Sequence, residues 1–225
     1  MGRRRSPLRK LLRRFRWVIV IAIVLLWMKQ QGWLEEVLPT ELPGKPSPTQ
    51  TEAPTKYDRD DWRHWTDADD DCQNTRHEVL EAESEIPVTF KSSKHCTVTR
   101  GRWRCPYTGK VITDPRKLDV DHMVPLHEAH RSGGHAWGKE RREIYANELG
   151  DEGHLVAVER GSNRAKGDKA PDHWMPANAD YRCEYVREWV RIKDRWSLEM
   201  RDEERAFIER VQAACDEGRT PPRKP

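Results

Sequence analysis

Short stretches in which apolar and polar residues alternate predict β-strands in the middle of the chain. The clearest is 118–122, where a leucine and a valine alternate with two aspartates before a histidine, the period of a half-buried strand. Pro125 must end this strand soon afterwards. Further short strands are expected at 86–90, at 96–99, on both sides of the Pro/Gly turn within 102–113, and at 154–158.

Helical periodicity appears between these strands and near the C-terminus. Asn74 is a candidate N-cap for a helix over 75–85, and shorter helices are expected at 139–149 and 162–168. Spacings of four, four, three and four residues place one largely aromatic stripe on the same side of a long helix. It consists of Tyr181, Tyr185, Trp189, Ile192 and Trp196. A second stripe follows on the last helix: Phe207, Val211 and Ala214. Both stripes are interpreted as core rather than as a nucleic-acid stacking surface, and the mixture of elements indicates the α+β class.

An uninterrupted apolar stretch, 17–28, follows a strongly basic start. Its 12 residues suit the apolar region of a signal peptide, about 7–15 residues long, better than a membrane span of about 20. No small-residue cleavage site follows, so 17–38 is interpreted as either a signal segment or a retained hydrophobic membrane helix. In both cases 1–16 stays in the cytoplasm, because basic flanks remain inside. The protein is therefore expected in the cell membrane with its domain outside the cytoplasm, or secreted if the segment is cleaved.

Charge is unevenly distributed along the chain. The net charge is +3, but eight Arg and Lys residues within 1–16 leave 3 − 8 = −5 for the rest. A basic balance usually indicates nucleic acid or an anionic surface, so a phosphate-binding patch in the exported part must be local. Five prolines in 39–56 predict a semi-extended linker, with 57–215 as the folded domain and 216–225 as a disordered C-terminus.

The five cysteines suit an oxidising compartment, and none of them forms a C-x-x-C pair. Two disulfides and one free thiol are therefore favoured over a structural zinc site. Sequence alone leaves the pairing open. The preferred pairs are Cys183 with Cys215, which would join the last two helices, and Cys72 with Cys96, leaving Cys105 free.

Two stretches carry candidate chemistry, 119–122 and 154–169. In the second, a strand leads into a helix on which Asn163 and Lys166 are three residues apart and share a face. Adjacent side chains of a strand point to opposite sides, so Asp121 and His122 reach one centre only where the strand ends. Strand, loop, strand and helix with polar tips form the skeleton of a small metal site.

These motifs resemble those of HNH endonucleases of the ββα-metal type, including the HNH domain of CRISPR effector nucleases. The resemblance rests on "DVDHMVPL" (119–126) and "NRAKGD" (163–168), with His154 on the intervening strand. Longer segments, among them "RCPYTGKVITD" and "NRAKGDKAPDHW", resemble exported HNH-family proteins related to modification-dependent restriction enzymes, over about 57–215. This chain has Cys105 where such relatives carry aspartate, and His154 where they carry asparagine.

The resemblance implies a ββα-metal core with additional helices and assigns roles to individual residues. Asp121 and Asn163 would bind Mg²⁺ or another divalent cation such as Mn²⁺, because oxygen ligands suit a hard ion. His122 would be the general base. His154 and Lys166 would support the site, and Lys166 and Arg164 would contact substrate phosphates. The expected activity is hydrolysis of DNA phosphodiester bonds with little base specificity, since no base-reading module is evident.

Two other interpretations compete with this one. A zinc hydrolase is suggested by four histidines close together in the sequence: His122, His127, His130 and His135. However, "HEAH" is one residue shorter than the zinc-binding H-E-x-x-H helix motif. The second interpretation is a catalytically inactive HNH fold that binds nucleic acid or another envelope component; the intact Asp121, His122 and Asn163 count against it.

Overall fold

The computed structural model describes residues 56–223. The expected basic tail, hydrophobic segment and nearly all of the linker lie within 1–55, outside the described residues, and stay predictions. In the part of the chain that is described, no helix has the length and apolar character needed to cross a membrane.

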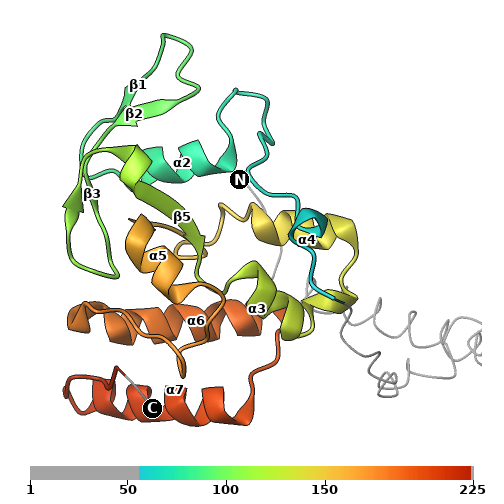
Figure 1. Ribbon diagram of the computed structural model, residues 1–225, viewed down its shortest axis with the longest axis vertical. Coiled ribbons are helices and arrows are strands. Elements are labelled where there is room, and N and C mark those ends of the chain that lie inside the picture. The colour runs from blue at the N-terminus through green and yellow to red at the C-terminus, as the bar shows by residue number, and fades with distance from the viewer. Residues whose placement is uncertain (1–55, 224–225) are drawn as a thin grey trace, which may run out of the picture. The chain divides into compact units, whose positions relative to one another are not determined.

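The described chain combines helices with short strands (Figure 1), which confirms the α+β class. The α-helices are α2 (Thr75–Ala82), α3 (Leu126–Arg131), α4 (Lys139–Ala146), α5 (Arg160–Lys166), α6 (Arg182–Trp196) and α7 (Asp202–Asp216). The strands are β1 (Thr89–Phe90), β2 (Val98–Arg100), β3 (Trp103–Arg104), β4 (Val111–Ile112), β5 (Leu118–His122) and β6 (Leu155–Glu159). Short 3₁₀ turns lie between them: η1 (Arg59–Asp61), η2 (Pro115–Lys117), η3 (Gly134–Ala136) and η4 (Ala179–Tyr181).

Within residues 56–223 the strands form three two-stranded antiparallel sheets, β1 with β2, β3 with β4 and β5 with β6. The β5–β6 pair is the longest, and its register runs without interruption from Leu118 opposite Glu159 to His122 opposite Leu155. Helix α5 begins directly after β6 and contacts both strands. Two antiparallel strands followed by a helix therefore form one local unit.

The two faces of β5 have different chemistry because its residues alternate between sides. Leu118 and Val120 belong to an apolar cluster with the buried residues of α2. Asp119 and Asp121 lie on the opposite face, where their carboxylates contact side chains of α5. The sequence alternation that predicted a half-buried strand thus separates an apolar face from an acidic one.

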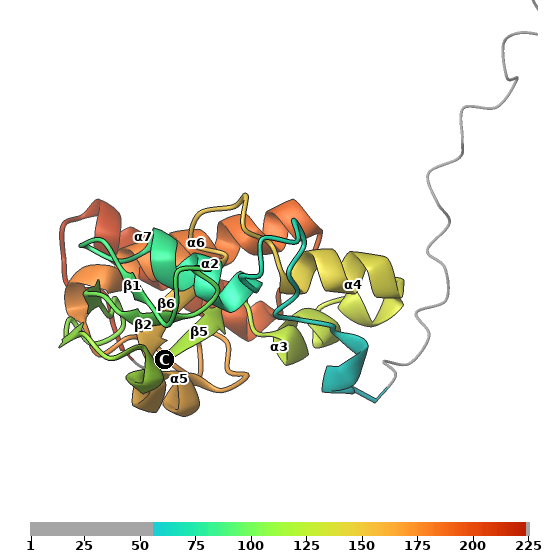
Figure 2. The same cartoon turned by 90° about the horizontal axis from the view of Figure 1, so that it is seen from above.

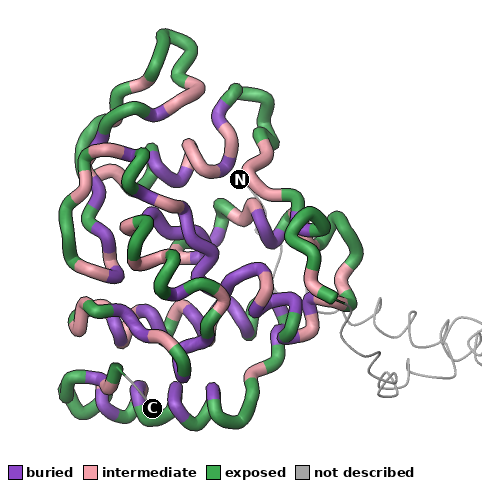
Figure 3. Tube along the Cα trace, viewed as in Figure 1, coloured by how far each residue is buried: buried purple, intermediate pink, exposed green. Residues whose placement is uncertain are grey.

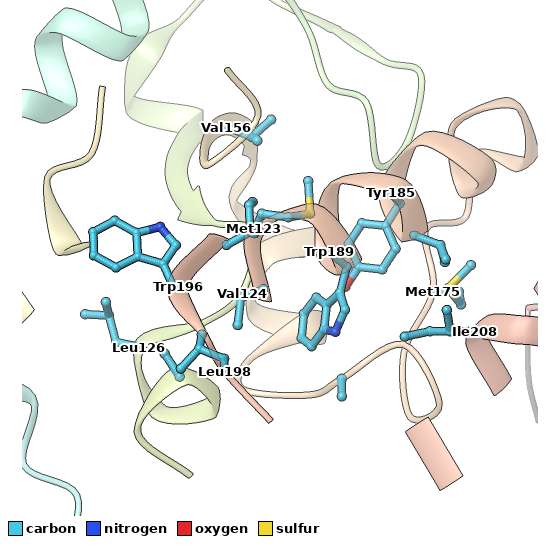
Figure 4. Packing of buried hydrophobic residues seen from close by; sticks show 14 of the residues in the cluster. Met123, Val124, Leu126, Val156, Met175, Tyr185, Trp189, Trp196, Leu198 and Ile208 are labelled. Atoms are coloured by element: carbon cyan, nitrogen blue, oxygen red, sulfur yellow. The ribbon is translucent and has the colours of Figure 1, made fainter. Parts of the chain in front are cut away.

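The larger apolar cluster lies around α6 and α7. Buried positions recur along one side of both helices (Figure 3). Figure 4 shows Met123 and Val124, which follow β5 directly, packed near Tyr185 and Trp189 of α6. This packing confirms that the aromatic stripe of α6 is core, and it holds the chain immediately after His122 in place.

The described residues contain two disulfides, and these are the two cysteine pairs preferred from the sequence. Cys72 is bonded to Cys96, while Cys183 and Cys215 connect α6 to α7, which lie side by side (Figure 2). Cys105 is the free cysteine of residues 56–223 and is buried.

The structure differs from the sequence analysis in two segments. Helix α3 was not predicted. Pro125 does end the strand, but its fixed φ also suits the N-terminus of a helix, which starts at the next residue. Residues 216–223 were expected to be disordered, yet Pro221 is buried and its carbonyl accepts a hydrogen bond of 2.8 Å from the guanidinium of Arg182. Other element ends shift by a few residues; for example, the helix expected over 75–85 ends at Ala82.

Candidate active site

A cavity of about 360 Å³ lies at the end of β5. The residues predicted as catalytic, Asp121, His122 and Asn163, all line it. Further walls come from the segment around η1, from α3 and from the end of α5. A larger hollow of about 660 Å³ lies along β2 and η2 and contains none of the predicted residues. The fold therefore brings the three side chains to one small cavity, although Asn163 lies far along the chain from the adjacent Asp121 and His122.

His122 is buried at the last position of β5, and one of its ring nitrogens is occupied. Nε2 lies 2.9 Å from the backbone carbonyl of Ala146 at the end of α4. A carbonyl only accepts, so Nε2 carries the proton and donates it, which leaves the lone pair on Nδ1. Among residues 56–223, Nδ1 has no hydrogen-bond partner. Burial, and then the neighbouring His154, hold the pKa of His122 well below its usual value. The ring is therefore neutral at neutral pH and can accept a proton at Nδ1.

Asp121 is buried and only one of its carboxylate oxygens is used. Oδ2 accepts hydrogen bonds from the hydroxyl of Tyr107 at 2.6 Å and from the ammonium of Lys166 at 2.5 Å. Oδ1 has no hydrogen-bond donor among the described residues. Burial raises the pKa of Asp121, and Lys166 opposes this shift only in part. A second cation, placed beside Oδ1, would balance the remaining negative charge of this buried carboxylate.

Asn163 is half-buried on α5, opposite the acidic face of β5. Its Nδ2 lies 3.3 Å from Oδ2 of Asp119, so the amide is oriented with its nitrogen toward β5. The amide oxygen has no partner within residues 56–223. Asp121 and Asn163, each with one side-chain oxygen that has no partner among the described residues, therefore line the same cavity.

Lys166 and Arg164 occupy different environments. Lys166 is 0% exposed, and besides Asp121 its ammonium donates to the backbone carbonyl of His122 at 2.8 Å. This burial does not fit the prediction that Lys166 contacts a phosphate; instead the lysine ties α5 to the end of β5. Arg164 is exposed at the rim of the cavity, where a guanidinium remains available to an anion.

His154 is also buried and lies beneath the site rather than in the cavity. Its Nε2 is 2.8 Å from the carbonyl of Tyr145, the residue next to the Ala146 that binds His122. Its backbone carbonyl accepts from Met123 at 2.9 Å. His154 therefore links the end of α4 to the chain that follows β5.

Three residues of the site were missed from the sequence. Tyr107 lies in the turn between β3 and β4, and only the fold brings its hydroxyl to Asp121. His127 and Asp168 line the cavity with Nδ1 and Oδ2 2.9 Å apart. His127 directly follows the first motif and Asp168 is the last residue of the second, and this position was the one available signal in the sequence.

The zinc interpretation gains no support from the fold. Within residues 56–223, the one set of three or more His, Cys, Asp or Glu side chains close enough to share an ion is exposed and consists of Asp67, Asp69 and Asp71. No histidine belongs to that set.

Comparison with known proteins identifies the class of this domain. Residues 74–209 match the family described as GmrSD restriction endonucleases, C-terminal domain. The described domain is thus a nuclease domain of the restriction-enzyme class. The match spans more than half of the 225 residues, and the chain belongs to the family of GmrSD restriction endonuclease C-terminal domains.

Similarity to a curated protein extends over most of the chain. An uncharacterized secreted protein of Arthroderma benhamiae is 33% identical over 159 residues, which is 71% of this chain and 76% of that protein. No solved structure matches the chain. The family match confirms the resemblance to restriction-enzyme nucleases that the motifs indicated.

Proposed function

We propose that this chain is a metal-dependent endonuclease of the HNH type that hydrolyses DNA phosphodiester bonds with little sequence specificity. The observation that supports this most is the shared cavity of Asp121, His122 and Asn163, in which one acceptor atom of each side chain has no partner in the described residues. The β5–β6–α5 unit would then be the ββα-metal core.

The residues of the cavity fit a hard divalent cation. Oδ1 of Asp121 and the amide oxygen of Asn163 are oxygen donors, the ligand type that Mg²⁺ and Mn²⁺ prefer. The raised pKa of Asp121 reflects a buried carboxylate with too little positive charge beside it, and a bound cation would supply that charge. The cation would also stabilise negative charge that develops on the phosphate oxygens.

His122 takes the role of general base in this proposal. The hydrogen bond to Ala146 fixes the ring so that the lone pair of Nδ1 is free to accept a proton from a water molecule. Lys166 and Tyr107 hold the Asp121 carboxylate in place, and His154 binds the backbone of Met123, which follows His122, and of Tyr145 at the end of α4. Arg164 at the rim would contact a phosphate, which positions DNA without reading its sequence.

Export from the cytoplasm is part of the proposal. Two disulfides within residues 56–223 suit an oxidising compartment, and the Arthroderma benhamiae relative is a secreted protein. The hydrophobic segment 17–38 would serve either as a signal segment or as a single-pass anchor with the nuclease domain outside the cytoplasm.

The test is cleavage of supercoiled plasmid by the purified protein with Mg²⁺ or with a chelator. His122→Ala is expected to slow nicking by about 10²–10⁴, the usual contribution of a general base. His173→Ala is the matched control, because His173 is exposed and lies outside the cavity. Nicking that survives the chelator, or that His122→Ala leaves unchanged, contradicts the proposal; a metal-independent gel shift without cleavage would indicate a binding module instead.

A further inference from the structure

A second imidazole lines the same cavity and is not explained by the metal or by the base. His127 lies in the first turn of α3, and 39% of its side chain is exposed, whereas His122 is buried. The two histidines that line the cavity come from different elements, one from the end of β5 and one from α3. The cavity therefore holds a deeply placed imidazole and a solvent-accessible one.

The His127 ring is held in a defined orientation. Its Nδ1 lies 2.9 Å from Oδ2 of Asp168, and the same oxygen lies 2.8 Å from the guanidinium of Arg131. One face of the ring stacks on Tyr57, with the ring centroids 4.4 Å apart and an interplanar angle of 15°. Nε2 has no partner among residues 56–223. A carboxylate at Nδ1 orients an imidazole and balances its charge when it is protonated, which presents Nε2–H to a substrate.

Several charged and titratable groups surround His127. Asp168 and Arg164 come from α5 and the residues after it, Arg131 from α3, Tyr57 and Arg59 from the segment before and within η1, and Asp121 and His122 from β5. Asp168 is the acidic group in contact with the His127 ring. The cationic groups suit a phosphate in the cavity.

We infer that His127 is the general acid that protonates the leaving oxygen, a role that rests on the proposed nuclease function. His122 Nδ1 takes a proton from water, and the water oxygen forms a bond to phosphorus. The bond from phosphorus to the 3′ oxygen breaks, and its electron pair goes to that oxygen. His127 Nε2 donates its proton there, so the products are a 3′-hydroxyl and a 5′-phosphate. Both histidines then exchange protons with water, and Asp168 is a positioning residue that acts through His127.

Replacing the leaving oxygen separates this role from simple binding. In an oligonucleotide with sulfur in place of one 3′ bridging oxygen, the leaving group is a thiolate, a much weaker base than an alkoxide, and it departs without a proton. The flanking ordinary phosphates in the same strand serve as internal references, since they require protonation of the leaving group. The probe is incubated with Mn²⁺, and cleavage at each position is resolved on a sequencing gel for wild type, His127→Gln, Asp168→Asn and the control His173→Gln.

His127→Gln is expected to slow cleavage at ordinary phosphates by about 10²-fold while cutting at the sulfur position largely persists, so the ratio of the two rises. Asp168→Asn should change this ratio in the same direction by less, and His173→Gln should leave it at the wild-type value. An unchanged ratio in His127→Gln, or loss of cleavage at the sulfur position as well, overturns the assignment. Melting curves show whether each variant is folded, and Asp168→Asn decides the question if His127→Gln is not. Failure of the wild type to cut any position would instead contradict the nuclease function itself.

Discussion

Two lysines of the described domain are fully buried, and their surroundings differ in one respect. Lys193 on α6 lies between two carboxylates, 2.8 Å from Oε1 of Glu128 and 2.7 Å from Oε1 of Glu204. Lys166 on α5 lies beside a single carboxylate, that of Asp121. Both lysines are 0% exposed, so burial of charge alone does not distinguish a structural cluster from the one proposed to be catalytic.

The difference lies in the carboxylate oxygens. Both oxygens of Glu128 are occupied, by Ser132 and Lys193 on one side and by Arg131 on the other. Those of Glu204 are occupied as well, by Trp189, Lys193 and the backbone of Arg201.

Asp121, in contrast, keeps Oδ1 without a donor in the described chain, next to a cavity. Although burial acts to raise the pKa of Glu128, Lys193 and Arg131 hold it below its usual value, whereas the pKa of Asp121 stays raised. The carboxylate with an oxygen that has no donor, and not the buried lysine, distinguishes the proposed cation site.

The largest effect is expected when the Asp121–Lys166 pair is replaced as a unit. In the double variant Asp121→Asn with Lys166→Met, no buried charge is left unpaired, so the free energy of unfolding should stay within about 2 kcal/mol of wild type. Metal-dependent plasmid cleavage should fall by about 10³-fold, since the charged ligand is gone. Rates and urea denaturation are measured on the same preparation. Retained cleavage would show that Asp121, like Glu128, serves only the stability of the fold. The proposed difference between the two lysine clusters would then be wrong.

A smaller effect, confined to stability, is expected in the cluster of Lys193, Glu128 and Glu204, where every carboxylate oxygen has a donor. Glu204→Gln removes one of the two carboxylates that neutralise Lys193 and should lower the free energy of unfolding by about 3 kcal/mol. For a domain of this size that corresponds to a melting temperature lower by about 6–12 °C. Cleavage by the folded variant should be unchanged well below its melting temperature. A Glu204→Gln protein that melts normally but cleaves poorly would reverse the assignment of the two clusters.

The smallest effect concerns the buried imidazole beneath the site. Burial, the dominant cause, lowers the pKa of His154 to about 4. In the unfolded chain His154 therefore binds a proton near pH 6.5, whereas in the folded chain it binds one only near pH 4. The contribution of His154 to the free energy of unfolding is fully present above pH 6.5. It falls by about 1.4 kcal/mol per pH unit as the pH drops from 6.5 toward 4.

The pH effect is measured by urea denaturation between pH 7 and pH 4.5. His154→Gln can still donate to the Tyr145 carbonyl but has no proton to take up, so its stability should fall less steeply with acid. Equal slopes for wild type and His154→Gln would mean that other groups cause the acid sensitivity of the domain.

Much of this arrangement could be predicted from the sequence because the signals are local. The alternation in 118–122 predicted the strand and its acidic face, and the stripe of Tyr185, Trp189 and Ile192 predicted the buried side of α6. The preferred disulfide pairs are also present. Each of these depends on spacing within one element or on a short list of alternatives.

Contacts between elements could not be predicted in the same way. Nothing near Lys166 in the sequence indicates that its ammonium is buried against Asp121 and the carbonyl of His122, because that depends on how α5 lies on β5. The hydroxyl of Tyr107 and the carbonyl of Ala146 reach Asp121 and His122 from turns and helix ends that only the fold brings near.

By itself the sequence determined the strand–strand–helix unit, the family and the three side chains of the candidate site, because alternation, helical spacing and motif order are properties of neighbouring residues. Only the tertiary structure decided which atoms of those side chains remain free. A hydrogen bond to a distant backbone carbonyl selects Nδ1 of His122, and one distant ammonium and one distant hydroxyl occupy Oδ2 but not Oδ1 of Asp121. Availability of an atom depends on every group packed around it, and that set is assembled only when the chain folds.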